Sequence, residues 1–129
     1  MNLKATIGME THVELDTKSK MFCSCEVVET DEPNISVCPT CLGLPGALPV
    51  PNKTAIEYIV MLSLGANCKI TNEGMFHRKN YFYPDLPKNY QISQFDFPVG
   101  VNGSLEIVLD EELHSVEIER VHMLSLIHI

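Results

Sequence analysis

Polar and apolar residues alternate along residues 7–15, near the start of the chain. In a β-strand, successive side chains point to opposite faces, so the pattern predicts a strand with one polar face. That face carries Gly8, Glu10, His12 and Glu14, and the other carries Met9, Thr11, Val13 and Leu15. Residues two apart lie about 6 to 7 Å from each other, which lets two carboxylates and an imidazole share a hydrated cation. A polar edge that faces solvent explains the same residues, and the pattern leaves both interpretations open.

The second predicted element is a helix over residues 53–67. Asn52 is a favoured helix N-cap, and the residues after it are apolar on most faces of a helix. Gly65 and Asn67 suit its end, because both accept the backbone conformation of a C-terminal stop. We interpret Met61 as core packing without a chemical role.

Toward the other end of the chain, the pattern predicts two antiparallel strands, over residues 104–109 and 115–123. The Gly-Val-Asn-Gly sequence at residues 100–103 is a hairpin turn signal and is expected to precede the first strand. Alternation in the second strand places Val116, Ile118, Arg120 and His122 on one face. Arg120 and His122 are then either a phosphate contact or satisfied core groups. Strands toward both ends with a central helix predict an α+β fold with a mixed, mainly antiparallel sheet.

Residues 76–94 form a segment of a different kind. Pro84 and Pro87 exclude a regular helix or a long strand, so we expect a loop that is rich in functional side chains. The candidates are Lys79 and Lys88 for phosphates, Asp85 for a metal or a ribose, and Tyr81 or Tyr83 as hydrogen-bond donors. A well-packed, aromatic-lined surface loop explains the composition equally well.

Composition and charge narrow the choice of function. The 129-residue chain has the length of one domain or part of one. Its formal net charge of −8 disfavours general nucleic-acid binding, because nonspecific affinity comes from Lys and Arg. The longest apolar stretch, residues 59–66, is too short to cross a bilayer. The first residues lack the apolar core of a signal peptide, so we expect a cytosolic protein.

Four of the five cysteines form two close pairs, Cys23 with Cys25 and Cys38 with Cys41. The second pair has the Cys-Pro-x-Cys form of a zinc knuckle, in which one tight turn supplies two thiolates, while the first pair has a narrower spacing. In a reducing compartment, clustered cysteines favour a metal over disulfides. The spacing therefore predicts one zinc site, with Cys68 as a separate, buried residue.

Five blocks of the sequence together resemble the amino-terminal part of the B subunit of the bacterial and organellar aspartyl/glutamyl-tRNA amidotransferases. The blocks are IGMETHVEL, KSKMFCSC, VCPTCLGLPGALPVPN, RKNYFYPDLPKNYQISQ and IERVHM. They follow the family order and spacing from residue 7 to residue 123, which is far more specific than a cysteine pattern alone. The resemblance implies a fold that is part of a larger catalytic cradle.

In activity, the resemblance implies a ligase component that uses ATP to phosphorylate the side-chain carboxylate of Glu on tRNA(Gln) or of Asp on tRNA(Asn). Ammonia from the amidase partner, the A subunit, then displaces the phosphate and forms the amide, and the small C subunit braces the other two. The tRNA is expected to bind mainly to family regions that this chain lacks, and no membrane is involved. The implied location is the bacterial cytoplasm or an organellar matrix.

The resemblance also implies roles for individual residues. Glu10 and His12 match positions near a magnesium ion. Cys23, Cys25, Cys38 and Cys41 match the zinc ligands, and four thiolates leave no open position, which implies a structural ion. The implied catalytic candidates are Lys79, Tyr83, Asp85, Lys88, Arg120 and His122, of which Lys79 and Lys88 are also expected to contact ATP.

The resemblance ends at Met123. There the family continues into acidic residues of the metal site, whereas Leu-Ser-Leu-Ile-His-Ile follows here. We therefore expect residues 1–123 to be an incomplete amino-terminal part of the catalytic domain and residues 124–129 to be foreign sequence. Such a chain is expected to be inactive by itself. The alternative is a noncatalytic, zinc-stabilised interaction module.

Overall fold

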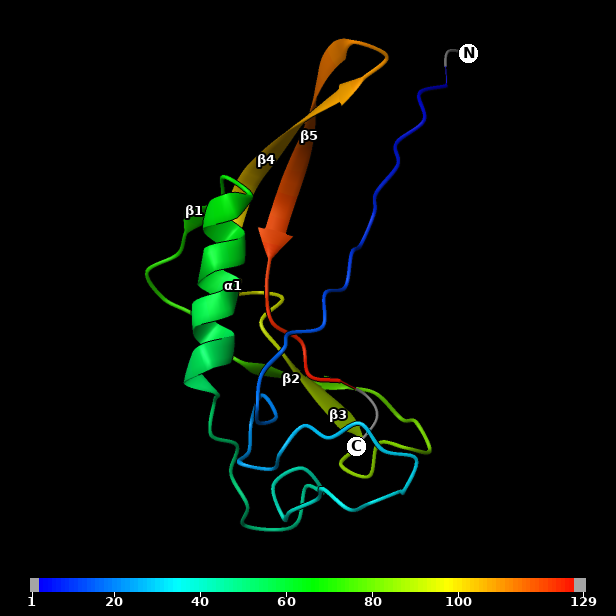
Figure 1. Ribbon diagram of the computed structural model, residues 1–129, viewed down its shortest axis with the longest axis vertical. Helices are drawn as coiled ribbons and strands as arrows, with labels where there is room; N and C mark the ends of the chain where they lie inside the picture. The colour runs from blue at the N-terminus through cyan, green and yellow to red at the C-terminus, as the bar shows by residue number, and fades with distance from the viewer. Residues whose placement is uncertain (1–2, 127–129) are drawn as a thin grey trace.

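The computed structural model describes residues 3–126, which form one helix, a three-stranded sheet and a two-stranded sheet (Figure 1). The elements in chain order are α1 (Lys53–Gly65), β1 (Lys69–Ile70), β2 (His77–Asn80), β3 (Tyr90–Ser93), β4 (Gly100–Leu109) and β5 (Glu112–Val121). The first sheet has the order β1-β4-β5 and the second pairs β2 with β3. Every strand pair in this part of the chain is antiparallel. The predicted α+β class is confirmed.

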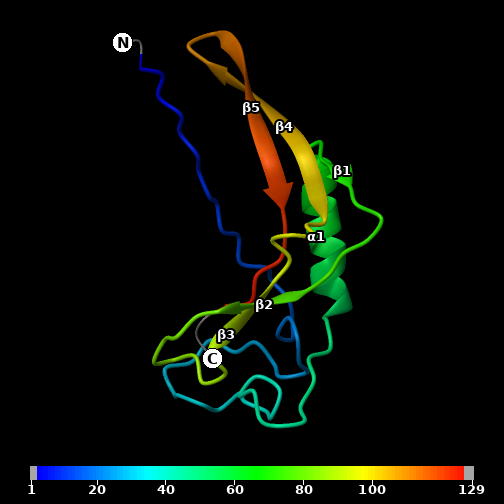
Figure 2. The ribbon, with the colours of Figure 1, turned by 180° about the vertical axis from the view of Figure 1, so that it is seen from behind.

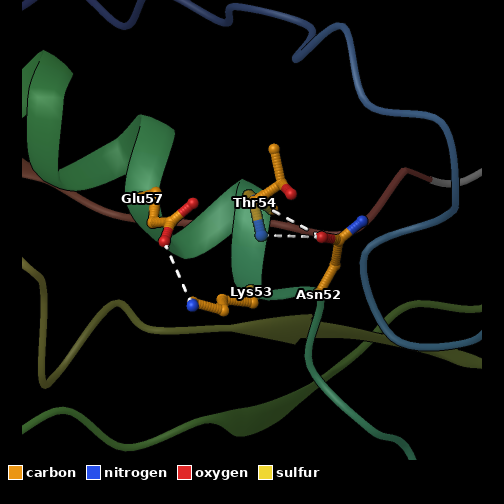
Figure 3. A network of polar contacts seen from close by, with 5 residues as sticks. Asn52, Lys53, Thr54 and Glu57 are labelled. Atoms are coloured by element: carbon orange, nitrogen blue, oxygen red, sulfur yellow. Dashed lines mark hydrogen bonds and ion pairs between the residues drawn. The ribbon is translucent and has the colours of Figure 1, made fainter.

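Helix α1 begins where the sequence predicts. The side chain of Asn52 accepts hydrogen bonds from the backbone N–H groups of Thr54 and Ala55, and Lys53 pairs with Glu57 at 3.6 Å one turn on (Figure 3). The helix ends two residues before the predicted bound, because Asn67 leaves the helical region with a φ of 52°. A side-chain cap at the start and a left-handed residue after the end define the helix.

The core lies along one stripe of α1. Ala55, Ile59 and Ser63 are its buried residues, spaced one helical turn apart. Ala55 and Ile59 pack with the buried Met123, and five partly buried side chains surround this group. They are Leu15, Met21, Phe76, Val99 and Val121. The core thus joins the helix to the end of β5 and to the segment that precedes the first cysteine.

The predicted turn at residues 100–103 is wrong, because these residues belong to β4. The glycines there allow close packing: a Cβ on Gly103 would lie 2.6 Å from the Ala66 carbonyl oxygen, and one on Gly100 would lie 2.7 Å from Ser63 Oγ. The hairpin itself is confirmed, with its turn at Asp110 and Glu111, whose φ angles are 50° and 67°. Two positive φ angles are typical of a two-residue type I′ turn.

The predicted strand at residues 7–15 is also wrong, since these residues pair with no strand in the described part of the chain. They belong to an extended segment that runs from the middle of the molecule alongside the β4–β5 hairpin (Figures 1 and 2), and residues 7–14 are exposed. Ile7 and Met9 are 86% and 83% exposed. Alternation sets which way side chains point, but a strand also needs a hydrogen-bonding partner, and the sequence pattern does not supply one.

The segment at residues 76–94 contains two short strands that the loop prediction missed. Strands β2 and β3 pair in the register Lys79↔Gln91, and Pro84 and Pro87 lie in the connection between them. The prolines therefore lie outside both four-residue strands and do not interrupt their pairing. Neither strand is long enough to give a clear alternating pattern.

Leu124 and Ser125, at the start of the tail that the sequence predicted to be foreign, lie against β3. Leu124 forms an isolated bridge with Ser93, and the buried Ser125 accepts a hydrogen bond from the backbone N–H of Ile92 at its hydroxyl. Residues 127–129 lie outside the described part of the chain. Within residues 3–126, α1 lacks the length and apolarity needed to span a membrane.

The close contact between β4 and the end of α1 gives a stability prediction. Gly103→Ala should lower the free energy of unfolding by about 1–3 kcal/mol, because the new methyl group meets a backbone carbonyl that cannot rotate away. Gly8→Ala is the control, since no atom lies within 4 Å of the added Cβ. Urea unfolding measures both variants, and equal midpoints for them would contradict the packing described here.

Candidate metal centre and adjoining polar site

Four cysteine sulfurs meet at one point. The Sγ atoms of Cys23, Cys25, Cys38 and Cys41 all lie within 4.8 Å of one another. Around a tetrahedral zinc ion with bonds of about 2.3 Å, sulfurs are about 3.8 Å apart. The Sγ atoms of Cys38 and Cys41 already have a separation of 3.8 Å. The predicted cluster is confirmed, and its donor set could hold a metal ion.

Two tight turns present these sulfurs. At residues 38–44, the N–H of Leu42 donates to the Cys38 carbonyl at 3.1 Å, and the N–H of Leu44 donates to the Pro39 carbonyl at 2.9 Å. The Cys38 N–H also points to the Cys41 sulfur, 3.1 Å away. The first pair lies in a reversal that is closed by the Lys20 N–H donating to the Cys25 carbonyl at 2.9 Å. Backbone hydrogen bonds therefore hold the two cysteines of each pair close together.

The thiols differ in acidity. The pKa of Cys38 is lowered to about 6, mainly because the backbone N–H of Cys41 stabilises its thiolate. The pKa of Cys25 is raised to about 12 and that of Cys23 is also raised, in both cases mainly by burial. At neutral pH Cys38 is thus a thiolate, whereas Cys23 and Cys25 carry protons that a metal ion must displace.

A second group of side chains lies at the end of β5. The guanidinium of Arg120 stacks on the ring of Phe95 at 3.9 Å, and the His122 ring meets the same phenyl ring edge-on at 6.0 Å. Arg120 also pairs with the neighbouring Glu119. Sequence reasoning selected Arg120 and His122 but missed Phe95, which follows the predicted functional segment by one residue and has no polar group to mark it.

Three further candidate site residues act electrostatically on His122. Its pKa is lowered, mainly by burial and next by the charge of Arg120. Lys79 and His12 act in the same direction, and Glu10 opposes them. Side chains from the extended amino-terminal segment, β2 and β5 therefore lie within electrostatic reach of one imidazole. The structure thus brings together five of the predicted site residues from three separate segments.

The remaining candidates lie in the β2–β3 connection, residues 81–89. Tyr83 and Asp85 are exposed there, and the Tyr83 ring lies 6.1 Å from that of Tyr81. Lys88 is half-buried and lies beside the cysteine cluster: burial lowers its pKa, while Cys41 and Cys23 act to raise it. The structure therefore associates Lys79 with His122 and Lys88 with the cysteines.

Comparison with known proteins gives concordant matches. Residues 5–125 match the family model described as GatB/GatE catalytic domain. The chain is 58% identical over 118 residues to the B subunit of an aspartyl/glutamyl-tRNA(Asn/Gln) amidotransferase from Rhodococcus jostii, covering 91% of this chain and 24% of that protein. The proteins of the same name from Frankia casuarinae and Persephonella marina are 56% and 50% identical, over 91% and 95% of this chain and 23% and 26% of their own lengths. The chain spans about a quarter of the length of these relatives.

The cluster geometry predicts which cysteines bind metal. Cys38→Ser should lower the affinity for zinc at least about 10-fold, because it removes one of four converging sulfurs. Cys68→Ala is the matched control, since Cys68 is buried beside β4 and lies outside the cluster. Cobalt titration followed by the thiolate-to-metal absorption band measures both. A Cys38→Ser affinity equal to that of the control would contradict the assignment.

The thiol pKa values predict how metal binding depends on pH. A metal binds thiolates, so protons compete with it and affinity falls as the pH falls. Near pH 7, binding should release the protons of Cys23 and Cys25, and below the Cys38 pKa of about 6 a further proton should be released. Calorimetric titration in buffers of different ionisation enthalpy counts these protons. Binding without proton release near pH 7 would be inconsistent with the raised pKa values.

Proposed function

The chain belongs to the GatB/GatE catalytic-domain family, and on this basis we propose that it forms part of the B subunit of a tRNA-dependent amidotransferase. Identity of 50–58% to proteins with that name supports the proposal. We propose that residues 1–123 are the amino-terminal part of the catalytic domain. The complete protein would work with an amidase, the A subunit, and with the small C subunit in the bacterial cytoplasm or an organellar matrix.

The proposed reaction has two steps. ATP first phosphorylates the side-chain carboxylate of Glu or Asp carried by tRNA(Gln) or tRNA(Asn). Ammonia from the amidase partner then displaces the phosphate and leaves the amide. Phosphoryl transfer depends mainly on positioning the reactants and on neutralising the charge that develops on the phosphate oxygens.

The observation that carries this proposal is the convergence of charged groups around His122. The positive charges of Lys79 and Arg120 act on the pKa of His122, as do Glu10 and His12, so all four lie within electrostatic reach of that imidazole. Cations suited to phosphate thus lie beside a carboxylate and an imidazole suited to a metal ion. Arg120 is held in place by its stacking on Phe95. Tyr83, Asp85 and Lys88 remain proposed substrate or ATP contacts.

Magnesium is the proposed cation at Glu10 and His12. Bound Mg²⁺ supplies charge neutralisation on the phosphates and typically takes one or two protein carboxylates, with water and substrate oxygens completing its shell. Glu10 offers one carboxylate, which fits that pattern. His122, kept neutral by its lowered pKa, is suited to accept a proton from ammonia as the amide forms.

The cysteine cluster has a separate, structural role in this proposal. Four thiolates fill the tetrahedral shell of a zinc ion and leave no position for a substrate. The ion would join residues 23–25 to residues 38–41 and thereby fix the segment that leads into α1.

A noncatalytic interaction module is the second candidate. The observation in its favour is the exposed apolar surface of the β4–β5 hairpin, where Val108 and Leu113 are 69% and 65% exposed. These residues form a register pair close to the turn. They offer a contact surface for another protein or for further parts of the family fold.

Substitution at the polar site separates the two candidates. In the complete protein with its partners, Glu10→Gln and His12→Ala should each lower ATP-dependent formation of Gln-tRNA or Asn-tRNA by at least about 100-fold, because a metal or phosphate contact is lost. Glu29→Gln is the control, as Glu29 is an exposed carboxylate in the loop between the cysteine pairs. Zinc content should stay unchanged in all three variants. Wild-type amide formation by both Glu10→Gln and His12→Ala would refute the catalytic proposal.

A further inference from the structure

The β2–β3 connection is packed directly onto the second cysteine turn. Gly43, two residues after Cys41, has a φ of 68°, and a Cβ added to it would lie 2.5 Å from Lys88 Cβ and 3.1 Å from Lys88 Cα. Glycine is therefore required both by the backbone conformation and by the space. Leu86, in the same connection, is fully buried. This contact places the backbone of Lys88 against the turn that carries Cys38 and Cys41.

The ammonium group of Lys88 lies within electrostatic reach of the cluster. Its side chain is half-buried, and the Nζ atom lies 5.8 Å from the centre of the Tyr90 ring. Cys41 and Cys23, one from each cysteine pair, both act on its pKa in the direction that favours the charged form. Cys41 and Cys23 thus lie within electrostatic reach of this ammonium, and their thiolates would favour its positive charge.

Lys20 precedes the first cysteine pair in the chain and also contacts the segment that precedes the second pair. Its Nζ donates to the Ser36 carbonyl at 2.6 Å, and its backbone N–H donates to the Cys25 carbonyl at 2.9 Å. Lys20 therefore ties together the two segments that carry the cysteine pairs. It also lies close enough to Lys88 to lower the pKa of that residue by charge repulsion. A negative partner near both ammonium groups would offset this repulsion.

A loaded cluster supplies that partner. Four thiolates around a divalent ion leave two negative charges in excess, and two ammonium groups balance them. We propose that Lys20 and Lys88 are the counter-charges of the tetrathiolate centre, and that Lys88 thereby couples metal binding to the β2–β3 connection. The inference rests on the proposed metal site, but it requires neither ATP nor tRNA. In this role Lys88 links the metal to the strand pair that carries Lys79.

Metal affinity tests the counter-charge role without any measurement of catalysis. Lys88→Met and Lys20→Met keep most of the side-chain length but remove the charge, and each should lower the affinity for zinc about 10- to 100-fold. Lys88→Arg should restore affinity to within a few-fold of wild type. Lys69→Met, on the exposed position of β1, is the control and should have no effect. Competition with a chromophoric chelator, with zinc as the only added metal, measures all four variants of the full chain.

A second substitution distinguishes charge from packing. Cys25→His replaces a thiolate by a neutral imidazole and removes one negative charge from the loaded cluster. In that background, Lys88→Met should cost several-fold less affinity than in wild type. An equal cost in both backgrounds, or wild-type affinity of Lys88→Met, would overturn the proposal. If Lys88→Met does not fold, Lys88→Gln and Lys88→Arg give the same comparison, and an affinity of Lys88→Gln equal to that of Lys88→Arg also overturns it. Because no step needs tRNA, failure here leaves the amidotransferase proposal to its own test.

Discussion

The convergence of four cysteine sulfurs is the constraint on which residues 19–52 and the segments packed against them depend. Residues 19–52 contain no helix or strand and bury few apolar side chains, so regular hydrogen bonding and a hydrophobic core contribute little to their order. Short contacts link this segment to the rest: the N–H of Asn52 donates to the Met21 carbonyl at 2.8 Å, and Phe22 packs edge-on against Phe76 at 5.0 Å. A metal ion bound by both cysteine pairs replaces the missing core. The start of α1 and the start of β2 are both positioned from this segment.

The β2–β3 pair connects this scaffold to the polar site. The charge of Lys79, on β2, lowers the pKa of His122, whereas Lys88 in the following connection lies beside the cysteines. Strand β3 in turn pairs with the chain just after His122, through Ser93 and Leu124. Two lysines that look equivalent in sequence therefore belong to different environments within one small hairpin. A change in the cluster has a short structural route to the groups around His122.

Features determined by local chemistry could be predicted from the sequence. Asn52 marked the start of α1, the cysteine spacing marked the cluster, and alternation placed Arg120 and His122 on the same side of the chain, where both contact Phe95. Features that depend on distant partners could not be predicted. The alternation around Glu10 and His12 predicted a strand, but these residues form none, because pairing requires a neighbouring strand that a local pattern does not specify. Gly100 and Gly103 resemble turn residues until the end of α1 is placed against them, and the close packing of Lys88 against Gly43 has no signal in the local sequence.

Amide hydrogen exchange before and after metal removal tests most directly whether the cysteine cluster organises this part of the molecule. The zinc-loaded chain and the same chain treated with a chelator would be compared peptide by peptide. We expect residues 19–44 and 81–92 to lose protection on chelation, while the β4–β5 hairpin, which is held by its own ladder of hydrogen bonds, keeps most of its protection. Unchanged protection of residues 81–92 after complete loss of the metal would contradict the account.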